Sequence, residues 1–157
     1  MVLTPPASPG SSSMPEMFVD KFRALVPKYL GRKWSEQDGI SYDELEGLLG
    51  EHKFQVPQAL VEFYHALGGC EDLMEAHDFF WDPDELEIED GYLLFLDEMD
   101  EEANWGFREE HLAVPDPIVW IRTNTGNAGW QSEEATFSEF VFDMFDWVFG
   151  EDEDQDG

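Results

Sequence analysis

Apolar residues recur at helical spacing in the first part of the chain. Phe18, Phe22 and Leu25 lie three or four positions apart, which predicts a helix over residues 16–26. Proline has no N–H to donate and disfavours helical backbone in the residue before it, so we expect this helix to end near Pro27. The chain is therefore predicted to open with a helix that buries one apolar face.

Two further helices are predicted before residue 70. Ser41 and Glu44 have the spacing of a capping box, and leucines at helical spacing follow them. Pro57 suits the first turn of the next helix, where its missing N–H costs nothing. We expect Gly68-Gly69 to end that helix, because glycine adopts the left-handed conformation easily.

The middle of the chain changes from helical spacing to the pattern of strands. Residues 92–96 form an apolar run typical of a buried strand, and we expect residues 103–108 to pair with it as a hairpin. Residues 118–123 are rich in β-branched side chains and predict another strand, followed by a turn at 124–127. Trp130 is expected to begin or end a further short strand.

A closing helix is predicted over residues 137–149. Thr136 and Glu139 have the spacing of a second capping box, and the helix is apolar nearly all round, so it should be largely buried. Trp120 and Trp147 are expected in the core. Helices, then strands, then a helix predict an α+β fold, with one domain and a twisted, mostly antiparallel sheet flanked by helices.

Composition divides the chain into a folded region and two tails. Residues 1–15 are rich in Pro and Ser, and residues 151–157 are mostly acidic. Neither segment carries enough apolar groups to offset the entropy of ordering, so we expect both to be disordered. The α+β domain is expected to span residues 16–150.

Net charge narrows the classes of partner. The 157 residues include 37 Asp or Glu and 8 Lys or Arg, a formal charge of −29, which argues against nucleic acids and anionic membranes as ligands. The longest apolar runs are too short to span a membrane, and the N-terminus lacks the pattern of a secretory signal. One cysteine permits no internal disulfide. We therefore expect a soluble, cytoplasmic protein.

The negative charge is concentrated in one segment. Residues 71–110 hold seventeen acids and one base, whereas residues 1–70 hold nine acids and six bases. Because such a block repels itself, a surface for a basic partner is one interpretation, and a solvated face is the other. Aromatic rings among acids can also bind cations, and Trp105 beside the acidic loop is the tryptophan least expected to be buried.

The sequence contains no convincing catalytic or metal-binding motif. The four histidines lack the spacing of a zinc site. Cys70 is followed by Glu71 and Asp72, which should raise its thiol pKa and oppose a nucleophilic role. Residues 152–157 match the start of a calcium loop but lack its closing Glu. We therefore expect a protein that is not an enzyme and that uses no cofactor and no metal.

Four short motifs follow one another between about residues 40 and 150. They are a Pro-led helix ending in Gly68-Gly69, the Leu- and Phe-rich strand, the pair Trp105-Gly106 and the closing helix that starts at Thr136-Phe137. Their order and spacing resemble the SUKH superfamily, which includes fungal cell-wall-assembly regulators and many bacterial immunity proteins. The resemblance implies an α+β fold without catalytic machinery. In bacteria it implies binding and neutralisation of a toxin, often a nuclease.

The charge pattern and the resemblance favour the same function. A nuclease presents a basic cleft to its substrate, and an acidic protein can occupy that cleft. We therefore expect an SUKH-type immunity protein that neutralises a basic, nuclease-type toxin by protein–protein binding; a regulatory or scaffold module of the same fold is the alternative. The residues expected to bind the partner are Asp97, Glu98, Asp100, Glu101, Glu102, Trp105, Glu109 and Glu110.

Overall fold

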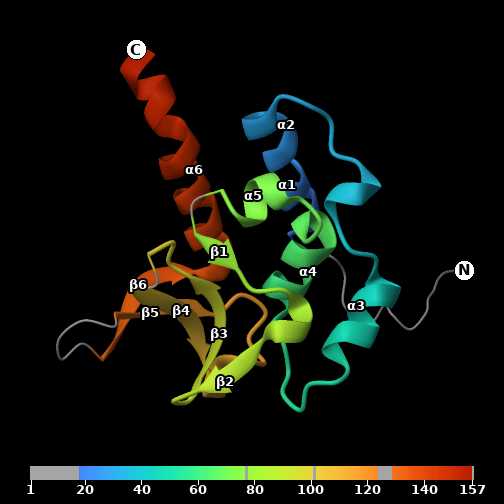
Figure 1. Cartoon of the computed structure of the whole chain (residues 1–157). Helices are drawn as coiled ribbons and strands as arrows, with labels where there is room; N and C mark the ends of the chain where they lie inside the picture. The colour runs from blue at the N-terminus through green and yellow to red at the C-terminus, as the bar shows by residue number, and fades with distance from the viewer. Residues whose placement is uncertain (1–17, 77, 101, 124–128, 157) are drawn as a thin grey trace, which may run out of the picture.

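An antiparallel sheet with helices packed on one face forms the protein, as the computed structural model shows (Figure 1). The structure describes residues 18–76, 78–100, 102–123 and 129–156, of which 150–156 are described by their backbone alone. The predicted α+β class is confirmed, and the described elements share one hydrophobic core. The predicted tail at the N-terminus and the predicted turn after residue 123 lie outside the described residues.

The structure contains more helices and strands than the sequence pattern predicts. The helices are α1 (Val19–Arg23), α2 (Leu25–Leu30), α3 (Tyr42–Leu49), α4 (Gln58–Leu67), α5 (Glu71–Met74) and α6 (Phe137–Asp156), with short 3-10 turns η2 (Glu36–Asp38), η3 (Pro83–Glu85) and η4 (Glu109–His111). The strands are β1 (Phe79–Phe80), β2 (Glu87–Glu89), β3 (Tyr92–Asp97), β4 (Ala103–Arg108), β5 (Ile118–Thr123) and β6 (Trp130–Thr136).

All described strand pairs are antiparallel. The sheet has the order β1-β3-β4-β5-β6, and β2 pairs with β3 on the same side as β1. The predicted hairpin is confirmed as β3–β4, and Trp130 begins β6. Leu94 pairs with Gly106 and Leu96 with Trp105, so Phe95 forms a bulge between these pairs.

The sequence pattern assigns no element between residues 70 and 91, where the structure has α5, β1 and β2. The clearest signal there is Asp90-Gly91, which joins β2 to β3 with positive φ angles of 58° and 85°. Two such residues in sequence make the hairpin turn that Asp-Gly favours. The hairpin could therefore have been predicted from this dipeptide.

The first helix differs from its prediction. Instead of one helix ending near Pro27, the chain forms α1 and α2 in succession, and Pro27 is the third residue of α2. The first N–H groups of a helix have no partner within it, so a proline in that turn removes no hydrogen bond. The break between the two helices instead falls at Ala24.

Gly68-Gly69 ends α4 as predicted, but for a different reason. Gly68 has a φ of −62°, so it is not left-handed. A Cβ on Gly68 would lie 2.5 Å from the Cδ1 of Ile40, and one on Gly69 would collide with the carbonyl of Gln37. The glycine pair therefore allows residues 37–40 to pack directly on the end of α4.

The capping box of α6 is confirmed. The Thr136 N–H donates to the Glu139 carboxylate at 3.1 Å, and the Glu139 N–H faces the Thr136 hydroxyl at 3.5 Å. Phe137, Val141 and Phe145 are buried on the side of the helix that faces the core.

The expected burial of two tryptophans is wrong. The side chain of Trp147 is 55% exposed, because α6 extends past the helices and the sheet as it continues to Asp156 (Figure 1). Trp120 is half-buried and outside the core cluster, because it lies on the sheet face opposite the helices. The helix bounds also include residues 151–156, which the sequence analysis assigns to an acidic tail.

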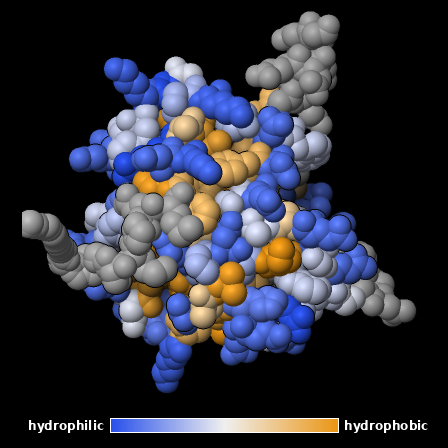
Figure 2. Space-filling model, turned by 180° about the vertical axis from the view of Figure 1, so that it is seen from behind, coloured by the Kyte–Doolittle hydropathy of each residue, from blue (hydrophilic) through white to orange (hydrophobic). Residues whose placement is uncertain are grey.

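The surface seen from behind has no single apolar face. Figure 2 shows hydrophobic residues as several patches with hydrophilic side chains between them. The exposed large apolar side chains of the described structure are Tyr42, Phe79, Met99, Val114 and Trp147. A partner could bury apolar surface at these positions.

A buried carboxylate holds the connection between α2 and α3. Asp38 is 4% exposed and accepts two hydrogen bonds from the Arg32 guanidinium, at 2.8 and 2.9 Å. It also accepts the Ser35 N–H at 2.9 Å. The Arg32 guanidinium, helped by the Ser35 N–H, lowers the pKa of Asp38 from 3.8 to about 2. The ionised form is therefore favoured in the folded chain.

Asp38→Asn is expected to lower the free energy of unfolding at neutral pH by about 1–2 kcal/mol, since Arg32 is half-exposed and solvent weakens its attraction. Because the folded pKa of Asp38 is the lower one, this contribution is present above pH 3.8 and is lost as the pH falls toward 2. Urea unfolding of the wild-type and Asp38→Asn proteins across this pH range should show that the difference between their free energies of unfolding shrinks as the pH falls. The exposed substitution Asp43→Asn is the control for the loss of one carboxylate, and a wild-type profile for Asp38→Asn would contradict the prediction.

Candidate protein-binding surface

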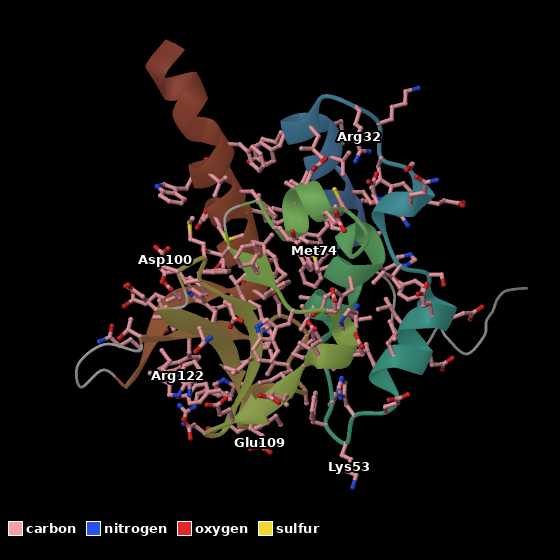
Figure 3. The ribbon with its side chains drawn as sticks, in the orientation of Figure 1. Arg32, Lys53, Met74, Asp100, Glu109 and Arg122 are labelled. Carbon is pink, nitrogen blue, oxygen red and sulfur yellow. The ribbon has the colours of Figure 1, made fainter. Side chains whose placement is uncertain are left out.

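The expected partner-binding residues lie at two opposite ends of the β3–β4 hairpin. Asp97 ends β3, and Glu98, Asp100 and Glu102 lie between β3 and β4, whereas Glu109 and Glu110 follow the far end of β4. Six-residue strands at 3.3 Å per residue separate these groups by about 17–20 Å. Figure 3 shows Asp100 and Glu109 at opposite ends of the sheet. The structure therefore does not bring the predicted residues together into one surface.

The first group, which we call the loop end, consists of Asp97, Glu98, Asp100 and Glu102. Asp97 accepts the side-chain amide of Asn104 at 2.5 Å. The Glu98 N–H donates to the Ala103 carbonyl at 3.0 Å, and the Glu98 carboxylate accepts the Glu102 N–H at 3.1 Å. These bonds hold the turn, while Asp100 and Glu102 remain exposed. Glu101 lies outside the described residues.

The loop end also carries two apolar side chains that the sequence pattern did not identify. Phe79 is 44% exposed and Met99 is 49% exposed. Phe79 pairs across strands with Asp97, and the Met99 N–H donates to the buried Asp78 carboxylate at 3.1 Å. The only signal in the sequence for the exposure of Phe79 was the pair Phe79-Phe80, in which strand alternation directs one ring into the core and the other outward.

Trp105 is not the exposed aromatic residue that the sequence analysis expects. It is 9% exposed, belongs to the core, and lies 5.8 Å from the Phe140 ring. Its indole N–H donates to the Glu133 carboxylate of β6 at 2.7 Å. The ring is buried because it shares the helix-facing side of β4 with Phe107. Trp105 therefore supports the sheet from inside and offers no ring to a partner.

The second group lies among bases of the same chain. Arg108 pairs with Glu110 at 3.4 Å. Arg122 pairs with Glu89 at 3.1 Å and with Asp90 at 2.9 Å. The negative charge at this end is therefore partly neutralised. In the described structure no ion pair joins a base to the four loop-end carboxylates. The Arg122 guanidinium approaches one of them through Asn104, because it donates to the Asn104 side-chain oxygen at 2.9 Å and the Asn104 amide donates to Asp97.

Aromatic rings on the open sheet face are already paired with cations of this chain. Trp130 stacks on Tyr92 at 3.8 Å, and the Arg122 guanidinium lies 5.1 Å from the Trp130 ring. The Arg108 guanidinium lies 5.4 Å from the Trp120 ring. The expected attraction between tryptophans and cations exists here. It is satisfied within the molecule instead of by a partner.

Two histidines and the cysteine that could support catalysis lie in structural positions. His52 lies 2.8 Å from the Pro83 carbonyl, and His65 lies 2.8 Å from the Ile40 carbonyl. Cys70 is buried, and this burial, more than the nearby carboxylates, raises its thiol pKa. Among the described residues no three His, Cys, Asp or Glu side chains are grouped to hold a metal ion. His77 lies outside the described residues.

No helix in the described ranges has both the length and the apolar character needed to cross a membrane. No family model matches the sequence, and no curated protein or solved structure matches it. The class that the fold and surface define is a single-domain α+β protein whose hairpin turns carry exposed carboxylates.

Proposed function

We propose that this chain is a non-enzymatic binding protein, an SUKH-type immunity protein that neutralises a basic, nuclease-type toxin by occupying its substrate cleft. The motif order described above supports the family assignment, and the α+β fold is of the class that the resemblance implies. The acidity supports the choice of partner, because a cleft that binds phosphates is rich in Lys and Arg.

The observation that carries the proposal is the position of the acids. Seventeen of them fall in residues 71–110, and the structure folds this segment into strands whose connecting turns lie at the ends of one sheet. The exposed carboxylates of this segment project a negative field toward an approaching cation. Such fields raise association rates by about 10–1,000-fold at low salt.

Co-expression with the polypeptide encoded immediately upstream of its gene is expected to restore growth of cells that this polypeptide would otherwise kill. The purified pair should bind, with a Kd that rises at least about tenfold between about 50 and about 500 mM NaCl, because salt screens opposite charges. Calorimetry at both salt concentrations measures the change.

The control is the same toxin expressed with an unrelated acidic protein, which should not restore growth. Killing that persists beside the full chain, or an upstream gene that encodes no basic protein, would contradict the immunity proposal. The second outcome would instead favour the regulatory or scaffold module.

A further inference from the structure

Apolar surface and uncompensated charge occur together at the loop end. Two of the five exposed large apolar side chains of the described structure, Phe79 and Met99, lie there. Burying such side chains against a partner lowers the free energy, and exposed apolar side chains with a polar rim are typical of a protein-binding site. The surrounding carboxylates supply that rim.

The backbone that presents these side chains is already ordered. Met99 is held by its N–H bond to Asp78 at 3.1 Å, and the turn is closed by the Glu98 and Ala103 main chains at 3.0 Å. Phe79 is fixed beside β3 because the neighbouring Phe80 is buried in the core, 4.7 Å from the Phe63 ring. A preformed surface loses little entropy when it binds.

The charge at the loop end selects the partner. Asp97, Glu98, Asp100 and Glu102 lie at the same end of the β3–β4 hairpin as the two apolar side chains, and no described ion pair joins a base to them. Docking of a second copy would bring like charges together, so self-association here is disfavoured. A cationic surface with apolar side chains between its Lys and Arg residues complements both features.

We propose that the loop end is the surface that docks the basic partner, with Phe79 and Met99 entering between its apolar side chains while the carboxylates pair with its Lys and Arg. This inference rests on the proposed function, and it assigns the contact to one of the two acidic ends. The Glu109 end is not assigned to the contact, because Arg108 there already pairs with Glu110, and Arg122 pairs with Glu89 and Asp90.

The test uses the full chain and two fluorescent peptides, amidated Lys-Arg-Leu-Lys-Leu-Arg-Lys and its counterpart with both Leu replaced by Ser. Wild type should bind the Leu peptide more tightly than the Ser peptide, by about threefold or more, because only the Leu peptide can bury Phe79 and Met99. Fluorescence anisotropy gives both Kd values, and each variant is checked for folding by circular dichroism.

Two charge variants separate the ends of the hairpin. Asp100→Lys with Glu102→Lys should raise the Kd of the Leu peptide by about tenfold or more, whereas Glu109→Lys with Glu110→Lys, an identical change in net charge, should raise it by about threefold at most. Equal weakening by both variants, or stronger weakening by the second, would overturn the assignment.

Two apolar variants test the contact itself. Phe79→Ser with Met99→Ser should abolish the preference for the Leu peptide, whereas Val114→Ser, at a position 43% exposed elsewhere, should keep it. A preference that survives in the double variant would contradict the inference. Growth rescue tests the immunity role without peptides. If the chain rescues growth but the loop-end variants bind the peptides like wild type, the assignment of the loop end is refuted and the immunity role is not.

Discussion

Phe137→Ala is expected to lower the free energy of unfolding by about 3–5 kcal/mol. The ring is fully buried where α6 begins. It meets the rings of Phe63, Phe95 and Phe107 at centroid distances between 5.2 and 5.6 Å, in edge-to-face geometry, and that of Phe22 at 6.2 Å. Truncation would leave a cavity between a helix and the sheet that these surrounding rings cannot fill without moving.

Urea unfolding followed by tryptophan fluorescence measures this loss. Trp147→Ala on the same helix is the control, because that ring is 55% exposed and its removal should change the stability by less than about 1 kcal/mol. Equal losses of unfolding free energy in the two variants would contradict the position of the Phe137 ring between the helix and the sheet.

Glu62→Ala is expected to lower the free energy of unfolding by about 2–4 kcal/mol. Glu62 is only 2% exposed, and its carboxylate accepts the N–H groups of Phe18 and Val19 at 2.6 and 3.0 Å. It also accepts the side-chain amide of Gln58 at 2.5 Å. These N–H groups start α1, so the substitution would leave them without their acceptor and remove a negative charge from the helix N-terminus.

Glu62→Gln should keep about half of the stability that Glu62→Ala loses, because one carbonyl oxygen can still accept a backbone N–H. The exposed substitution Glu46→Ala should cost less than about 0.5 kcal/mol. Hydrogen exchange at Val19 offers a local measurement, since its amide should exchange faster only when the acceptor is lost. An unchanged exchange rate in Glu62→Ala would contradict the capping role.

The local patterns were reliable where one short-range interaction decides the structure. Ser41 accepts the Glu44 N–H at 3.2 Å, as the capping box predicts, and the β3–β4 hairpin forms where the apolar runs predict it. Prediction failed at Pro27 because a proline stops a helix or sits in its first turn depending on where the helix begins. That start depends on tertiary packing.

The candidate surface was predictable only in part. Counting acids identified residues 71–110, but charge alone cannot say which carboxylates share a surface. The register of β3 and β4 places Asp100 and Glu109 at opposite ends, and Arg108 pairs with Glu110 at the second of these ends. Trp105 was assigned to the surface because its acidic neighbours in sequence do not reveal the burial of its side chain.

The sequence by itself determines the excess of negative charge, the α+β class and most helix and strand positions, because these follow from composition and from contacts between near neighbours. Only the tertiary structure decides that Phe79 and Met99 are exposed, that Trp105 is buried, and that Glu62 caps a helix more than forty residues before it. Burial and pairing depend on residues far apart in the chain, and folding brings them together.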